Sequence, residues 1–65
     1  MEWIRLMVLS DLLQAKVILS KLESNNIDCN LIEKKDSSYD SLYSEYEIYV
    51  VAGQEHLAKL VVENQ

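Results

Sequence analysis

The sequence of 65 residues contains no proline and only one glycine, one cysteine and one histidine. A lone cysteine, Cys29, leaves no internal disulfide, and one cysteine with one histidine cannot build a structural zinc site of the Cys/His type. A single glycine excludes a glycine-rich phosphate loop. We therefore expect no metal and no cofactor. Because a domain of this size buries only about 60% of its unfolded surface, we expect self-association to supplement its core.

Basic residues are scarce as well: six lysines and arginines stand against 11 acidic residues, which gives a formal net charge of −5. Nucleic-acid binding depends largely on neutralising phosphates with Lys and Arg, so we expect no nucleic-acid partner. The apolar amino terminus is interrupted by Glu2, Arg5 and Asp11, which argues against a signal peptide and a membrane span. We expect no membrane contact and a cytoplasmic location, with which a reduced thiol is compatible.

With 49% apolar and 26% charged residues, the chain has the composition of a globular protein, and we expect one domain over residues 1–65. Alternating apolar residues predict strands over 3–9, 27–34 and 45–51. Helical spacing predicts helices from residue 12 to the sequence SNN at 24–26 and over 54–64, the first of them starting at Ser10 and Asp11.

The order β-α-β-β-α predicts an α+β fold with two helices on one face of a three-stranded sheet. A right-handed crossover after the first strand leaves room for the third strand to pair antiparallel with both others. We expect a truncated ferredoxin-like two-layer sandwich with strand order 1-3-2. The outer edge of the first strand and one sheet face would then be uncovered, and that face would carry the candidate interface residues Trp3, Arg5, Met7, Ile32, Tyr49 and Val51. The opposite side of the first strand, with Ile4, Leu6 and Val8, would face the helices.

The sequences MEWIRL at the start, LESNNI at the end of the first helix and EIYV in the last strand occur in this order along the chain. In this arrangement the chain resembles a family of short bacterial proteins, of unknown function, that are named prokaryotic signal-transducing proteins. The resemblance covers nearly the whole chain and implies a PII-like fold and a regulatory function. PII-like proteins hold nucleotides with glycine- and Lys/Arg-rich contacts, for which this chain lacks the residues.

The connection between the second and third strands is longer than the two to five residues that a hairpin needs. It brings together both charge signs, two hydroxyls and a phenol in Lys34, Lys35, Asp36, Ser37, Ser38 and Tyr39. One interpretation is a loop whose Asp and Ser side chains bond to nearby backbone amides. The other is a binding site for a small ligand or a protein partner, which would explain the length.

The candidate catalytic residues have simpler structural explanations. Cys29 fits a core strand position, and His56 fits a solvated helix face. Glu45 and Glu47 share one strand face, where we expect one to pair with Arg5 and the other to be solvated. Because no nucleophile stands beside a base, we expect no enzymatic activity.

These observations favour a non-enzymatic regulatory, signal-transducing or interaction module that forms a homo-oligomer through the first-strand edge or the Trp3/Tyr49 face. Its loop would be presented to a small molecule or a protein. Two alternatives stay open: a nucleic-acid binder that stacks bases on the sheet aromatics, which the net charge disfavours, and a purely structural subunit of a larger complex.

Overall fold

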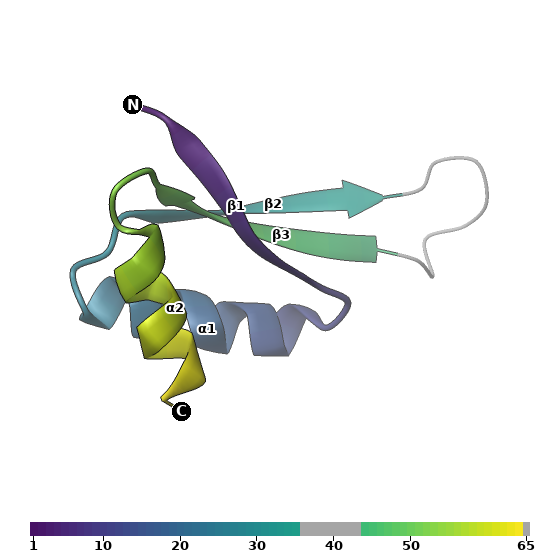
Figure 1. The fold of residues 1–65 in the computed structure, drawn as a ribbon. Helices are drawn as coiled ribbons and strands as arrows, with labels where there is room; N and C mark the ends of the chain where they lie inside the picture. The colour runs from purple at the N-terminus through teal and green to yellow at the C-terminus, as the bar shows by residue number, and fades with distance from the viewer. Residues whose placement is uncertain (36–43, 65) are drawn as a thin grey trace.

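A computed structural model describes residues 1–35 and 44–64 (Figure 1). Its elements follow the order β1 (Trp3–Leu9), α1 (Leu12–Ser24), β2 (Cys29–Lys35), β3 (Ser44–Val51) and α2 (Glu55–Glu63). β3 lies in the centre of a three-stranded sheet and pairs antiparallel with β1 on one side and β2 on the other. Both helices lie on the same side of this sheet (Figure 1). The predicted α+β fold and strand order 1-3-2 are confirmed.

Three backbone features explain where the helices and turns are placed. Asp11 caps α1, because its Oδ1 accepts a hydrogen bond from the backbone N–H of Leu13 at 2.9 Å. After α1 the chain turns at Asn26, whose φ of 61° lies in the left-handed region that asparagine tolerates better than most residues. Gly53 has a φ of 101° in the turn between β3 and α2, and this conformation favours glycine.

The core lies between the sheet and the helices. Its buried members come from both helices, from β3 and from the segment between α1 and β2: Ala15, Ile18, Leu22, Ile27, Tyr46, Ile48, Val50 and Ala58. The alternation predicted for β3 is therefore confirmed. The apolar stripes of the helices are narrower than the sequence indicates, because Leu12 and Leu57 are 40% and 49% exposed.

The predicted alternation of β1 is wrong after Arg5. Arg5 lies opposite Tyr49 and Met7 lies opposite Ile48, so that Leu6 is an extra residue in β1, as in a β-bulge. Met7 then shares the helix-covered side with Ile48 and packs with Leu6 against the core. Val8, opposite Glu47, is turned to the uncovered side and is 39% exposed. The bulge exchanges the faces that the sequence pattern assigned to Met7 and Val8.

In the part of the chain that the structure describes, no helix is long and apolar enough to cross a membrane. The backbone has a radius of gyration of 12.4 Å. The helix α2 contacts β1 and β3, whereas α1 contacts all three strands. This arrangement places α2 at the β1 end of the sheet.

Candidate functional site

The sheet face opposite the helices, which we term the open face, is the candidate functional site. No described residue outside the sheet covers it (Figure 1). The strand register and the alternation of the strands assign to this face Trp3, Arg5, Val8, Asn30, Ile32, Lys34, Glu45, Glu47, Tyr49 and Val51. It therefore combines apolar, aromatic and charged side chains in a single layer.

Glu47 lies at the centre of the open face, on the middle strand. It is only 5% exposed although it faces away from the helices. Its direct neighbours on the two edge strands, Val8 and Ile32, flank it on both sides. An isolated carboxylate is costly to bury in such surroundings, so its polar partners decide whether it is stable there.

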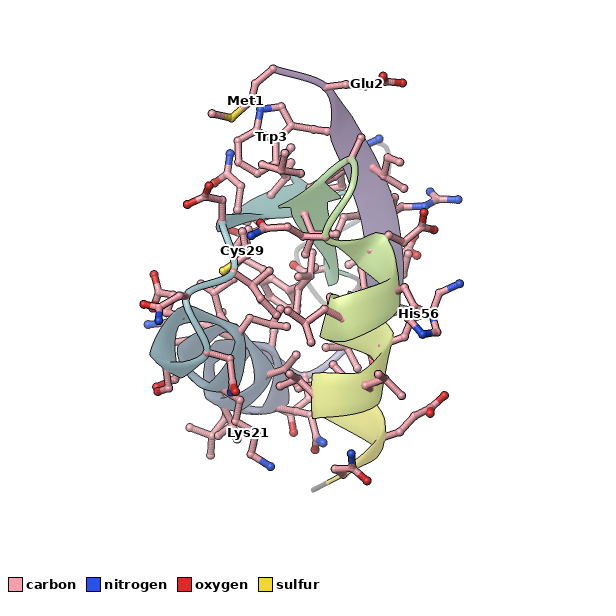
Figure 2. All side chains as sticks on the ribbon, turned by 60° about the vertical axis from the view of Figure 1, so that its left-hand side comes forward. Met1, Glu2, Trp3, Lys21, Cys29 and His56 are labelled. Atoms are coloured by element: carbon pink, nitrogen blue, oxygen red, sulfur yellow. The ribbon has the colours of Figure 1, made fainter. Side chains whose placement is uncertain are left out.

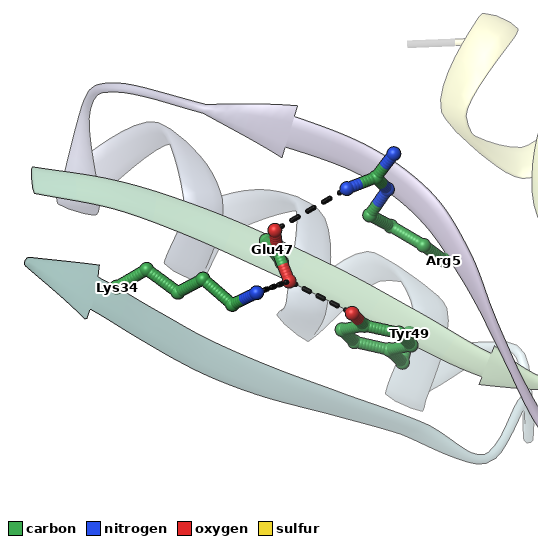
Figure 3. Close-up of polar contacts among 4 residues, drawn as sticks. All are labelled: Arg5, Lys34, Glu47 and Tyr49. Atoms are coloured by element: carbon green, nitrogen blue, oxygen red, sulfur yellow. Dashed lines mark hydrogen bonds and ion pairs between the residues drawn. The ribbon is translucent and has the colours of Figure 1, made fainter.

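Three side chains from three strands satisfy this carboxylate (Figure 3). The hydroxyl of Tyr49, two residues along β3, donates a hydrogen bond to Glu47 Oε1 at 2.8 Å. Arg5 Nη1, on β1, donates to Oε2 at 3.3 Å. Lys34 Nζ, on β2, lies 3.6 Å from Oε1. We call these four residues the Glu47 cluster.

The electrostatics of the Glu47 cluster favour an ionised carboxylate. The hydrogen bond from Tyr49 is the main cause that lowers the pKa of Glu47, and the charges of Lys34 and Arg5 add to it while burial opposes them. The same hydrogen bond, together with burial, raises the pKa of the Tyr49 hydroxyl. Glu47 is thus charged and Tyr49 neutral at physiological pH.

The two cations of the Glu47 cluster remain accessible to solvent. The side chains of Arg5 and Lys34 are 57% and 63% exposed, in contrast to 6% for Glu47. The guanidinium has five N–H donors, and one of them reaches Glu47. Arg5 and Lys34 therefore have donors left for an acceptor group that approaches the open face from outside.

Apolar side chains surround the Glu47 cluster. Trp3, opposite Val51, and Ile32, opposite Glu47, are each 41% exposed. Figure 2 shows Trp3 at the end of the molecule remote from the helix surface that carries Lys21. Exposed apolar groups around a few placed charges are the composition of many protein–protein interfaces.

Most of the predicted interface residues do share the open face: Trp3, Arg5, Ile32, Tyr49 and Val51. Met7 does not, because the bulge turns it toward the core, and Val8 takes its place. The pairing of Arg5 with one of the two glutamates is confirmed, since Glu47 is its partner and Glu45 is exposed.

The predicted loop site is only partly within the described residues. Lys34 and Lys35 belong to β2 rather than to a loop. Lys34 contacts Glu47 on the open face, and Lys35 Nζ lies 4.0 Å from Glu33 Oε2. The other predicted loop residues, Asp36, Ser37, Ser38 and Tyr39, lie outside the described residues.

Among the residues that the structure describes, neither Cys29 nor His56 has partners typical of catalysis. Cys29 lies between the sheet and α1 (Figure 2), with its Sγ 3.8 Å from the carbonyl oxygen of Leu19. Burial, reinforced by the charges of Glu23 and Asp28, raises the pKa of this thiol and disfavours the reactive thiolate. His56 is exposed on α2. Within residues 1–35 and 44–64, no group of three or more His, Cys, Asp or Glu residues is placed to hold a metal ion.

Comparisons with family models, curated proteins and solved structures found no significant match. The open face must therefore be interpreted from its own chemistry.

Sequence reasoning missed two members of the Glu47 cluster. The pairing with Tyr49 had a signal in the sequence, because residues two apart in a strand share a face. The pairing with Lys34 depends on the register of β2 against β3, which sets Lys34 opposite Glu45 and makes it a diagonal neighbour of Glu47. No local sequence pattern specifies that register.

Proposed function

We propose that this protein is a non-enzymatic regulatory or interaction module that self-associates and binds a protein partner on its open face. The observation that carries the proposal is the composition of this face, in which exposed Trp3 and Ile32 accompany the Glu47 cluster, a buried carboxylate with two accessible cations. Aromatic and arginine side chains are enriched among the residues that dominate binding energy at interfaces. We propose in addition a signal-transducing role, which rests on the family resemblance, and a cytoplasmic location, which rests on the composition.

The charges indicate which partner would fit. Glu47 is already satisfied by three groups, whereas Arg5 and Lys34 retain exposed donors. A partner that presents a carboxylate between two apolar side chains would pair with these cations and cover Trp3 and Ile32. Charge-assisted hydrogen bonds from a guanidinium to a carboxylate are stronger than neutral ones.

The nucleic-acid alternative has less support from the same face. Its central charge is the Glu47 carboxylate, and the Tyr49 hydroxyl is bonded to it. Arg5 and Lys34 are the cations that the described residues place on this face, and a phosphate backbone is bound by many more basic groups. We expect no mobility shift with single-stranded DNA or RNA at low salt, and binding that falls steeply as salt is added would instead support the alternative.

The proposal is tested with a variant of the open face and a matched variant of the helix layer. Trp3→Asp places a charge on the open face, while Leu13→Asp makes the same type of change at a residue of α1 that is 71% exposed. Partners cross-linked to the wild-type protein in a cell extract are identified by mass spectrometry. We expect the Leu13 variant to retain them and the Trp3 variant to lose them. Equal retention by two folded variants would exclude the open face.

A further inference from the structure

We propose that a second copy of this chain binds at the outer edge of β1, with its own β1 antiparallel, so that two three-stranded sheets become one six-stranded sheet. This inference rests on the self-association in the proposed function and specifies its surface and symmetry. A two-fold axis perpendicular to the sheet would place both helix layers on one side and both open faces on the other.

The two edge strands of the sheet differ in how well they are protected against pairing with another strand. β1 and β2 are the edge strands, because β3 lies between them. β2 ends in the charged residues Glu33, Lys34 and Lys35, and the N–H of Leu31 is bonded at 3.0 Å to the side chain of its neighbour Asn30. Charged residues are a common protection of edge strands against pairing. The β2 edge is therefore protected against pairing with a further strand.

The β1 edge lacks this protection. Its sequence, WIRLMVL, contains one charged residue, Arg5, whose guanidinium is directed to Glu47 on the open face. An edge strand presents unpaired backbone N–H and C=O groups, which form a template for another strand. The bulge at Leu6 limits how far a regular ladder can extend. Contacts beyond the strand itself must therefore contribute.

A groove beside β1 supplies such contacts. It has a volume of about 250 Å³ and is lined by Leu6, Met7, Lys59, Val62 and Glu63, so that it lies between β1 and α2. The bulge forms one wall, since it directs two consecutive apolar side chains to the helix side. A second copy paired with β1 would bring its own α2 alongside this groove and cover apolar surface in both subunits.

The charges on α2 are complementary to themselves under this symmetry. Lys59 and Glu63 lie one helical turn apart, and both line the groove. When two copies of α2 run antiparallel about the axis, Lys59 of each faces Glu63 of the other. Lys59 also pairs with Glu55 of its own helix, with Nζ 3.8 Å from Oε2, so the ammonium lies among acidic groups in either state.

The open face is a poorer surface for a second copy. A face-to-face dimer would bury Arg5 and Lys34 of both subunits, which are more than half exposed and share one satisfied carboxylate per subunit. Removing such charges from water is costly unless new partners appear. A stable interface needs about 800 Å² per partner, and the chain exposes 4664 Å². The β1 edge with α2 can contribute to this area while the charges stay at its rim.

Hydrogen exchange measured at two protein concentrations tests the surface directly. At high micromolar concentration we expect light scattering to give twice the 7.5 kDa mass of the chain. The backbone amides of residues 3–9 should then exchange more slowly than in the dilute monomer, while those of β2 should not change. If a stable dimer forms and its slowed amides lie in β2, or if no strand shows slowed exchange, the inference is overturned.

A charge exchange on α2 tests the symmetry. We expect Lys59→Glu to weaken dimerisation about tenfold, since two exposed pairs change from attraction to repulsion, and the double variant Lys59→Glu/Glu63→Lys to recover the wild-type affinity. Lys16→Glu, an equal charge change on the exposed surface of α1, is the matched control and should leave dimerisation nearly unchanged. A double variant as weak as the single one would contradict the two-fold pairing.

The two proposals fail in different ways. A wild-type protein that keeps the mass of one chain at high micromolar concentration would remove self-association from the proposed function and this inference with it. A dimer without protection of β1 would overturn the inference alone. Loss of partner contacts with an unchanged dimer mass would overturn the partner binding alone, because the partner contacts side chains of the open face and the second copy pairs with the backbone edge of β1.

Discussion

Replacing Met7 by alanine and, separately, Val8 by alanine distinguishes the bulged β1 from a regular strand. A regular alternation would bury Val8 and expose Met7. In the structure Met7 lies opposite Ile48 and packs against the core, and Val8 is 39% exposed on the open face. In the bulged strand Met7→Ala should therefore cost more stability than Val8→Ala, and in a regular strand the order would be reversed.

The magnitudes follow from burial. Truncating a buried Met to Ala costs about 2–5 kcal/mol. Because Met7 is only partly buried, we expect a loss of about 2 kcal/mol. Val8→Ala truncates a partly exposed side chain outside the core and should change stability by about 0.5 kcal/mol or less. A domain of 65 residues has a total stability of about 3–10 kcal/mol, so that both variants should still fold.

Thermal and urea unfolding, followed by circular dichroism at low micromolar concentration, measure the difference without a contribution from self-association. One kcal/mol shifts the Tm of a small domain by about 4–8 °C. Met7→Ala should therefore lower the Tm by about 8–16 °C, and Val8→Ala by only a few degrees. A larger loss for Val8 than for Met7 would refute the bulge and the assignment of both faces.

Two further predictions concern the Glu47 cluster and the turn after β3. The pKa of Glu47 is lowered in the folded state, so its ionisation stabilises the fold at pH values above the ordinary pKa of 4.5, and this stabilisation is lost as the pH falls through the lower folded pKa. Glu47→Gln should therefore lower the Tm at pH 7, and its Tm should decrease less on acidification than that of the wild type. Identical pH profiles of the two Tm values would contradict an ionised Glu47 cluster. Gly53→Ala should destabilise the protein by about 1–2 kcal/mol in urea unfolding, because the φ of 101° is strained for alanine. The strain lies in the backbone alone, since a Cβ there would meet nothing within 4 Å. An unchanged urea midpoint would show that the turn adopts another conformation.

The sequence alone determined the elements and their order. The alternation in 45–51, the cap at Asp11 and the turn at Asn26 depend on local backbone geometry and on side chains close in the chain, so they can be predicted without tertiary information. From the order β-α-β-β-α, the handedness of crossovers leaves few topologies, and the antiparallel sheet 1-3-2 follows. Five of the six residues predicted for the open face lie there.

Only the tertiary structure decided the features that depend on how strands are paired. The bulge at Leu6, which exchanges the faces of Met7 and Val8, arises from the register of β1 against β3, to which residues more than 40 positions apart contribute. The same holds for the Glu47 cluster, whose four members come from three strands, and for the groove between β1 and α2. Local patterns specify which side of a strand is apolar, but a single extra residue in the pairing reverses that side. For this reason the candidate site emerged from the register and not from any contiguous stretch of sequence.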